Sequence, residues 1–360
     1  MQSPKILFLV NGGGLGGAEQ VFLRQAQYLK EQGFQVWRGA VADQFHQDQD
    51  LLNFAFTHLY DRAAYRRLIN FCKTENISHI YATLDQAIFI ARVLKFFVPT
   101  LKIIIRESGM ASRKSIKIKL ADIFFNVLVS KMIAVSQDVA RSLVAYQSFY
   151  KNKIVVLNNG VDIYLSLEAL LQQKNNAKAN AIVILHVGSM HNDNKGQANL
   201  LRVFKNIVKQ RPDHDLSLWL VGDGKRRPVL ENLAKDLELI TQVKFWGEVD
   251  RVQLNHLYEQ ADIFVLNSQN EGCPNVVLEA MSFARPVVSS RVGGINEILQ
   301  DQKSGLIFPV NDQTSLERLL LKLIDEKATR LALGTNAYNF VKDNLTWETQ
   351  NTKLKTLFTK

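Results

Sequence analysis

Two glutamates, Glu271 and Glu279, flank a stretch of the chain that could bind a phosphorylated, hydroxyl-rich ligand. The run between them, GCPNVVL, passes from a loop into a helix that we expect to begin near Asn275. Free amides at the first turn of a helix bind anions, and carboxylates accept hydrogen bonds from hydroxyls. An exposed loop acid at 271 and a solvent-facing helix acid at 279 are the alternatives. The candidate amides belong to Gly272, Cys273, Asn275 and Val276.

A second candidate is the glycine-rich segment NGGGLGGAEQ, residues 11–20, which follows the apolar run KILFLV. Glycines this dense before a helix predict the close approach of a ligand, although one or two would suffice for a tight turn. The spacing Gly12-x-Gly14-x-x-Gly17 matches a dinucleotide fingerprint, which also requires an acid about 20 residues further on. That reading is weak because no acid follows the second expected strand before Asp43. A Walker-type phosphate loop is excluded because no lysine follows the glycines.

Short apolar runs alternate with amphipathic segments along the chain, which predicts parallel sheets covered by helices on both faces. A polar stretch near residues 162–180 interrupts this alternation, which then restarts. We therefore expect two Rossmann-like, doubly wound α/β domains at residues 1–165 and 180–344, with a last helix at about 345–360 that packs back on the first domain. The expected strands are 5–10, 34–41, 79–82, 102–106, 132–136, 153–158, 181–188, 216–222, 243–247, 262–267 and 286–290.

Composition excludes several classes of protein. The 360 residues are 47% hydrophobic and 22% charged, which is typical of soluble globular proteins. Two cysteines, Cys72 and Cys273, exclude a disulfide framework and predict a reducing, cytoplasmic setting. No apolar stretch is long enough to span a bilayer. Basic residues outnumber acidic ones by 20 to 13 in residues 1–170 and by 24 to 21 in residues 171–360, so the first half attracts anionic groups more strongly.

Several short motifs follow one another in order across both halves of the chain. They are Gly16-Gly17-Ala18-Glu19, Asn159-Gly160-Val161-Asp162, Val187-Gly188, Lys195-Gly196, Val221-Gly222-Asp223-Gly224, Phe245-Trp246-Gly247, the Glu271 to Glu279 segment and Val292-Gly293-Gly294. Together they resemble family 4 of the retaining glycosyltransferases, also described as glycosyl transferases group 1. The resemblance covers most of the chain. It implies the GT-B fold, in which two Rossmann-like domains face each other across a cleft that holds the active site.

The resemblance also implies roles for individual residues at a site for a nucleotide-sugar donor. Glu279 would hold the ribose, and Glu271 would contact hydroxyls of the transferred sugar, helped by the amides of Gly272 and Cys273. Lys195 would neutralise the diphosphate as its bond to the sugar breaks. The other implied donor-site residues are Asn275 and Val276 at the helix start, the glycines Gly16, Gly17 and Gly188, and Trp246, Gly247 and Glu248 beside the base.

One departure from the family's pattern concerns the diphosphate. Many relatives carry a basic residue just after the Val187-Gly188 pair, where this chain has Ser189 and Met190. The diphosphate would therefore lack one cation. The residues that could compensate are His191, Lys225 and Arg226.

A second departure lies at the end of the fourth strand of the first domain. Many relatives carry a histidine there, and this chain has Arg106 and Glu107. These two residues would orient the sugar or the acceptor, which places them with Glu271 and Lys195 among the candidate catalytic residues. The alternative is an ion pair at the rim of the domain.

The segment SRKSIKIKLADIFFNVLVSK, residues 112–131, combines basic and apolar residues at helical spacing. Basic amphipathic segments bind anionic lipid surfaces, so we expect peripheral membrane contact here. The alternative is a helix that packs on its own sheet and has a solvated basic start. The basic residues in its first half are Arg113, Lys114, Lys117 and Lys119.

The expected function is that of a retaining glycosyltransferase in surface polysaccharide or lipopolysaccharide assembly, at the cytoplasmic face of the membrane. It would move a hexose or N-acetylhexosamine from a nucleotide diphosphate sugar, expected to be a UDP-sugar, to a glycan or lipid-linked saccharide. We expect no cofactor and no metal, since no His, Cys and carboxylate cluster has ligand spacing. A nucleic-acid partner is not expected. The alternatives are a non-catalytic nucleotide-sugar-binding scaffold subunit and a GT-B sugar-nucleotide epimerase.

Overall fold

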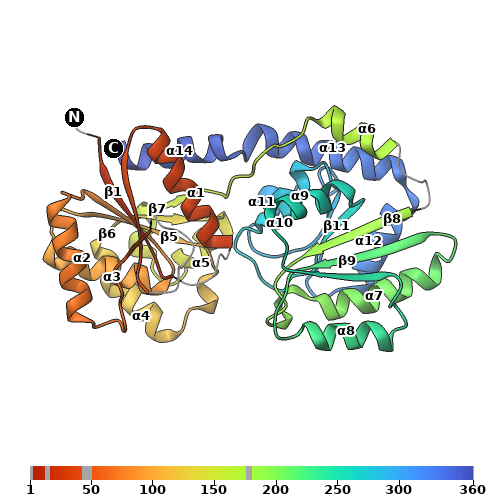
Figure 1. The fold of residues 1–360 in the computed structure, drawn as a ribbon, viewed down its shortest axis with the longest axis horizontal. Helices are drawn as coiled ribbons and strands as arrows, with labels where there is room; N and C mark the ends of the chain where they lie inside the picture. Colours follow the sequence, from red (N-terminus) through yellow and green to blue (C-terminus); the bar gives the residue numbers. More distant parts are fainter. Residues whose placement is uncertain (1–2, 13–16, 43–50, 176–180, 360) are drawn as a thin grey trace. The chain divides into compact units, whose positions relative to one another are not determined.

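The computed structural model describes residues 3–12, 17–42, 51–175 and 181–359 (Figure 1). The chain forms two compact units, one of Met1–Gly160 with Trp347–Lys360 and the other of Val161–Thr346. The chain therefore enters the second unit after Gly160 and returns to the first after Thr346. The polar stretch that suggested a linker near 162–180 contains helix α6 (Leu167–Asn175), and residues 176–180 lie outside the described part of the chain.

The first unit is built on a seven-stranded sheet with the strand order β3-β2-β1-β4-β5-β6-β7. All the paired strands are parallel. Side chains alternate between the two faces of β1, so that Phe8 packs on one face and Leu9 on the other. The strands are β1 (Lys5–Val10), β2 (Gln35–Ala40), β3 (Leu51–Asn53), β4 (His79–Thr83), β5 (Lys102–Glu107), β6 (Val129–Ala134) and β7 (Ile154–Val156).

Helices cover both faces of this sheet, as the near-continuous apolar strands require. Helices α1 (Gly17–Glu31) and α14 (Trp347–Thr359) pack side by side on one face (Figure 1). Helices α2 (Arg62–Thr74) and α3 (Asp85–Phe97) cover the other face. Two more helices, α4 (Ile116–Phe125) and α5 (Gln137–Val144), follow β5 and β6.

The second unit has a six-stranded parallel sheet with the order β10-β9-β8-β11-β12-β13. Helices α9, α10, α11 and α13 pack on one face, and α7, α8 and α12 pack on the other. The strands are β8 (Ala181–Val187), β9 (Asp215–Val221), β10 (Val243–Gly247), β11 (Ile263–Leu266), β12 (Val287–Ser290) and β13 (Leu306–Phe308). The helices are α7 (Gln197–Gln210), α8 (Arg227–Asp236), α9 (Arg251–Gln260), α10 (Asn275–Ser282), α11 (Ile295–Ile298), α12 (Gln313–Asp325) and α13 (Lys327–Asn344).

Each sheet reverses its strand order once, between β1 and β4 in the first unit and between β8 and β11 in the second. In doubly wound sheets the crevice outside the carboxyl ends of the strands at this reversal is where ligands bind. The loops that follow β1, β4, β8 and β11 are therefore the first places to look for a site. Among the described residues, no helix has both the length and the apolar character needed to cross a bilayer.

Candidate functional site

In the second unit, hydrogen bonds join the loops that follow β8 and β11 at the reversal of the strand order. The backbone N–H of Gln269 donates to the carbonyl of Asn194 at 2.7 Å, and the Asn194 amide donates to the carbonyl of Asn270 at 3.0 Å. The side-chain amide of Asn267 donates to the carbonyl of Gly196 at 2.9 Å. These bonds hold residues that are more than 70 positions apart in the sequence as one polar surface.

Lys195 and Glu271 meet on this surface. The Lys195 ammonium lies 2.5 Å from Glu271 Oε1, and the Ser268 hydroxyl donates to the same oxygen at 2.8 Å. Both charged side chains are mostly buried, with 24% of Lys195 and 14% of Glu271 exposed. A Cβ on Gly188 would lie 3.1 Å from Cγ of Lys195, so this glycine leaves room for the lysine stem. The structure thus brings together three of the residues expected at the donor site.

Two glycines of the sequence motifs are required by close backbone contacts around this pair. Gly196 has a φ of +68°, and a Cβ there would lie 2.2 Å from the carbonyl oxygen of Asn267. Gly293 has a φ of +43°, and a Cβ there would lie 1.9 Å from the carbonyl oxygen of Glu271. Any other residue would push the Lys195 turn or the Glu271 loop away from its neighbour. These glycines therefore fix the position of the ion pair.

Helix α10 begins at this loop with an N-cap residue that cannot cap it. Pro274 occupies the cap position, and its side chain makes no capping hydrogen bond. The N–H groups of the first helical turn point out of the N-terminus of the helix. An anion placed there would accept hydrogen bonds from them and be favoured by the helix dipole. Asn275 and Val276 are the first two residues of the helix, and Gly272 and Cys273 lie in the loop before it.

Glu279, one turn into α10, has both of its carboxylate oxygens engaged. Arg251 Nη1 lies 2.7 Å from Oε1, and the Tyr258 hydroxyl donates to Oε2 at 2.9 Å. Burial, reinforced by the Glu279 charge, raises the pKa of Tyr258 well above its usual value. The phenol therefore stays protonated and remains a donor. Each carboxylate oxygen still has a lone pair that can accept a further hydrogen bond from a ligand hydroxyl.

Four residues of this site were not predicted from the sequence. Tyr258 and Arg251 lie in α9, 21 and 28 positions before Glu279, and no spacing rule links them to it. Asn194 and Asn267 follow strands β8 and β11, and a polar amide after a buried strand is the signal that could have marked them. All four orient site residues or their loops.

Two uncharged residues, Ser189 and Met190, follow Gly188. Met190 is fully buried, and its N–H donates to the carbonyl of Asp223 at 2.8 Å. Of the three basic residues considered as substitutes, Arg226 contacts this loop: its N–H donates to the carbonyl of Met190 at 3.0 Å, and its guanidinium lies 2.6 Å from Asp193. Arg226 is therefore the cation that borders the turn carrying Lys195.

The three residues expected beside the base lie at the end of β10. The indole of Trp246 packs against Trp219 and lies beneath the Lys244 ammonium, which is 3.5 Å from the ring centroid. Gly247 has a φ of +69°, and a Cβ there would lie 2.9 Å from Nη1 of Arg227. Glu248 is exposed. Their contact with a base stays a prediction.

The two candidate catalytic residues of the first unit, Arg106 and Glu107, make hydrogen bonds and ion pairs with other residues of that unit. Arg106, at the end of β5, is buried and donates to the Asn159 side chain. Glu107, also buried, lies 2.6 Å from the Lys114 ammonium. The ion pair that the sequence left open is therefore present for Glu107, and its partner is Lys114.

The Lys114 ammonium also bonds a second carboxylate. It lies 2.8 Å from Asp122, which in turn is 2.9 Å from Arg92 and accepts a hydrogen bond from the Tyr146 hydroxyl at 2.6 Å. Burial opposes the charge on Lys114, but Glu107 and Asp122 raise its pKa. Lys114 and Arg92 balance the charges of Glu107 and Asp122. Glu107 therefore belongs to a buried cluster with no net charge at the carboxyl end of β5.

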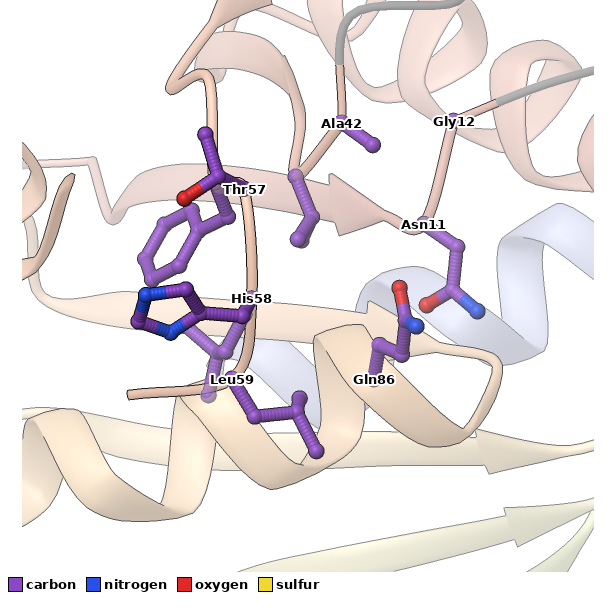
Figure 2. A pocket seen from close by; sticks show the side chains of 10 residues that line it. Asn11, Gly12, Ala42, Thr57, His58, Leu59 and Gln86 are labelled. Atoms are coloured by element: carbon purple, nitrogen blue, oxygen red, sulfur yellow. The ribbon is translucent and has the colours of Figure 1, made fainter. Parts of the chain in front are cut away.

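The glycine-rich segment after β1 is only partly described. Gly16 lies outside the described residues, and Gly17 is the first residue of α1. Gly12 has a φ of +98°, and a Cβ there would lie 2.6 Å from the carbonyl oxygen of Ala42. Gly12 is therefore needed because the backbone after β1 passes close to the backbone after β2, at the carboxyl ends of these strands (Figure 2).

His186 is a buried histidine of strand β8. It has no exposed surface, and its Nδ1 lies 2.9 Å from the carbonyl oxygen of Val265. Burial lowers its pKa to about 4. Within the described part of the chain, no group of three or more His, Cys, Asp and Glu residues is arranged to hold a metal ion.

Two family models together match most of the chain. The model described as Glycosyltransferase Family 4 matches residues 15–164, and that described as Glycosyl transferases group 1 matches residues 168–340. The chain belongs to the family 4 glycosyltransferases. The expectation drawn from the motifs is confirmed, since both models match in the order that the motifs indicated.

Relatives of this family 4 chain match it over different lengths. A D-inositol 3-phosphate glycosyltransferase of Corynebacterium kroppenstedtii is 35% identical over 44% of this chain and 36% of its own length. A sulfoquinovosyl transferase of Arabidopsis thaliana is 28% identical over 61% of this chain and 42% of its own. An uncharacterized glycosyltransferase of Haemophilus influenzae is 26% identical over 91% and 92%. The match thus spans less than half the length of the first two.

Solved structures confirm the GT-B fold. The Anabaena protein HepE in complex with UDP-glucose superposes with a TM-score of 0.83 at 22% identity, over 99% of this chain and all of that one. WaaG, a glycosyltransferase involved in lipopolysaccharide biosynthesis, superposes with a TM-score of 0.72 at 17% identity, over 98% of this chain and 99% of that one. At these identities the likeness establishes the fold.

Proposed function

We propose that this chain is a retaining glycosyltransferase that uses a nucleotide diphosphate sugar. It moves a hexose or N-acetylhexosamine, from a UDP-sugar, to a hydroxyl of a glycan or lipid-linked saccharide in surface polysaccharide or lipopolysaccharide assembly. The family membership supports the class of reaction. The UDP-glucose bound to HepE supports the choice of donor, and the lipopolysaccharide role of WaaG supports the pathway.

The observation that carries the proposal is the arrangement of charges around the start of α10. Lys195 and Glu271 form an ion pair before the helix, and Glu279 is fixed one turn inside it by Arg251 and Tyr258. A cation and the amides at a helix N-terminus suit a diphosphate, and flanking carboxylates suit the hydroxyls of a ribose and a sugar. The set matches the three parts of a nucleotide diphosphate sugar.

In the proposed reaction Glu279 accepts hydrogen bonds from the ribose, and Glu271 from the sugar. Lys195 and the α10 amides stabilise the negative charge that develops as the bond between the anomeric carbon and the phosphate oxygen breaks. The acceptor hydroxyl attacks the anomeric carbon on the same face, and its proton passes to the departing phosphate oxygen. This route retains configuration and requires no protein nucleophile.

A nucleotide-binding assay tests the proposal. Thermal unfolding is followed with UDP, GDP or ADP in EDTA, for the wild type, Glu279→Gln and the control Glu238→Gln, an exposed carboxylate of the same unit. A ligand at a hundredfold excess over its Kd stabilises its site by about 2.7 kcal/mol. UDP should stabilise the wild type and the control and lose its effect in Glu279→Gln. No shift with any nucleotide would contradict the proposal, and UDP binding without transfer from UDP-sugars would favour the scaffold alternative.

We further propose that α4 rests on the anionic surface of the inner face of a membrane. Ile116, Leu120 and Phe124 lie on one side of this helix and are 75%, 52% and 72% exposed, whereas Asp122 on the opposite side is buried. This is the reverse of an ordinary surface helix, whose apolar side packs on the protein. With basic residues at its start, such a face suits acidic lipid headgroups and a lipid-linked acceptor.

A further inference from the structure

The second unit opens with a short segment, residues 161–165, that packs against the core formed in part by α9 and α10. Val161 is buried in this core, and Ile163 and Leu165 are partly buried against it. The N–H of Val161 donates to the carbonyl of Leu345 at 2.9 Å. The backbone of the segment is therefore fixed next to the two helices that carry Glu279 and its partners.

Tyr164, within this segment, places its ring against the residues around Glu279. The ring stacks on Phe283, with centroids 6.1 Å apart and planes inclined by 24°. Phe283 also stacks on Tyr258, at 5.6 Å and 10°. Tyr258 is the residue whose hydroxyl donates to Oε2 of Glu279. One phenylalanine ring thus links Tyr164 to the first of the two side chains that hold Glu279.

The hydroxyl of Tyr164 contacts the second of these side chains, Arg251. The Arg251 guanidinium lies 2.7 Å from Oε1 of Glu279 and is also hydrogen-bonded to the Tyr164 hydroxyl. That hydroxyl donates its own proton to Oδ2 of Asp162 at 3.2 Å. It therefore accepts from Arg251 and donates to Asp162, and the guanidinium has two acceptors, Tyr164 and Glu279.

The second acceptor matters because Arg251 is a long side chain that is 42% exposed. A long, exposed side chain gains little from a single carboxylate partner, since it loses rotamer freedom when it pairs. With Tyr164 in place, the guanidinium is held at two points before any ligand arrives. The Glu279 carboxylate is then also fixed in advance, which lowers the entropic cost of accepting hydrogen bonds from a ligand.

We infer that Tyr164 is a positioning residue for the nucleotide donor, because it holds Arg251 on Glu279 and so raises the affinity for the nucleotide. It acts through Arg251 and not through the reacting atoms. Asp162, the last residue of the sequence motif at 159–162, orients the Tyr164 hydroxyl in this arrangement. The inference rests on the proposed function, in which Glu279 accepts hydrogen bonds from the ribose.

Titration calorimetry of the full chain with UDP tests the inference. Tyr164→Phe keeps the ring on Phe283 and removes the hydroxyl, so the Kd for UDP should rise by about threefold to tenfold, the effect of one hydrogen bond. The control is Tyr338→Phe, which also removes a hydroxyl that bonds this segment, at the Leu165 carbonyl, but does not touch Arg251. The control should bind UDP as the wild type does.

A second variant separates a positioning role from a merely structural one. In Arg251→Met the guanidinium is absent while Tyr258 still bonds Glu279, so UDP should bind more weakly, and adding Tyr164→Phe should cause no further loss. Losses that add in the double variant, an unchanged Kd in Tyr164→Phe, or an equal loss in Tyr338→Phe would each overturn the inference.

The same titrations distinguish failure of this inference from failure of the proposed function. If UDP does not bind the wild type, the proposed function fails, and the inference fails with it. If UDP binds the wild type and Tyr164→Phe equally well, the inference about Tyr164 fails alone.

Discussion

At the scale of single residues, the position of the Glu279 carboxylate is set by two partners on a neighbouring helix. Arg251 and the fully buried Tyr258 each bond one oxygen. Burial opposes the charge of Arg251, but Glu279 raises its pKa, so the guanidinium stays charged. A carboxylate held on both oxygens has little rotational freedom to lose when it accepts hydroxyl groups of a ligand.

Replacing Tyr258 by Phe should therefore weaken UDP binding without removing it. A hydrogen bond to a charged group contributes about 1.5–3 kcal/mol, so the Kd should rise roughly tenfold to a hundredfold. Titration calorimetry measures this directly. Tyr338→Phe is the control, because its hydroxyl donates to the carbonyl of Leu165 in the same unit but does not touch Glu279. Equal losses in both variants would show that the effect is one of stability.

The two glutamates could be singled out from the sequence because loop, helix start and acid spacing are local features, whereas the role of Lys195 was implied only by the resemblance to the family. Their meeting could not be derived from spacing, since Lys195 and Glu271 are 76 positions apart. Tyr258 and Arg251 could not be predicted either. Their contact with Glu279 arises from the packing of α9 on α10, which depends on the core and not on any motif.

His186 makes the stability of the second unit depend on pH. Burial lowers its pKa to about 4, against about 6.5 in an unfolded chain. The unfolded state therefore binds the proton first as pH falls, so the stability that is complete above about pH 6.5 is lost towards pH 4. For one group with these values, the loss between pH 8 and pH 5 is about 2 kcal/mol.

Hydrogen exchange of the β8 amides at pH 8 and pH 5 checks this expectation, after correction for intrinsic rates. His186→Asn should unfold with a pH dependence smaller than that of the wild type by about 2 kcal/mol. The comparison removes the contribution of other titrating groups. An identical pH dependence in the two proteins would mean that His186 does not titrate as its burial requires.

At the scale of elements, α4 differs from an ordinary surface helix. Apolar residues at 116, 120 and 124 repeat every four positions, and the structure turns this face outward, which excludes the alternative that the face packs on the sheet. The reason lies in the polar residues. Asp122 and Lys114 belong to a buried charge cluster with Arg92. Rotating α4 so that its apolar face packs on the sheet would expose Asp122 and break this cluster.

The double variant Leu120→Ser/Phe124→Ser should lose affinity for anionic vesicles. Burial of each side chain in lipid contributes about 1.5–3 kcal/mol, so the partition coefficient should fall more than tenfold. Co-sedimentation with phosphatidylglycerol vesicles measures it, with Ile240→Ser/Val252→Ser as the control, two exposed apolar residues of the second unit. Failure of the wild type to bind, or equal binding by both variants, would contradict membrane contact through α4.

The strands show how much of the fold can be predicted from the pattern of apolar residues. All eleven expected strands are present, because a strand buried on both faces reads as a continuous apolar run. Two further strands, β3 (LLN) and β13 (LIF), were not predicted, since three residues are too short to show a period. Both lie at sheet edges, where pairing with a single neighbour is enough to form them.

At the scale of the whole molecule, the chain completes its first unit only with its last helix. It leaves that unit after Gly160 and returns after Thr346. Helix α14 then contributes Leu354 and Phe358, both nearly fully buried, to the core that contains Phe8 and Tyr81. The first sheet therefore has one face covered by a segment that is synthesised after the entire second unit.

Truncating this contact should destabilise the first unit selectively. Leu354→Ala removes a fully buried side chain and should cost about 2–5 kcal/mol. Hydrogen exchange should show this loss at the β1 and β4 amides, while β8 exchange and UDP affinity, which belong to the second unit, stay within error of the wild type. Lys353→Ala, at an exposed neighbouring position of α14, should change neither. If Leu354→Ala lowered protection equally in β1 and β8, the two units would unfold together, and the first would not depend on α14 alone.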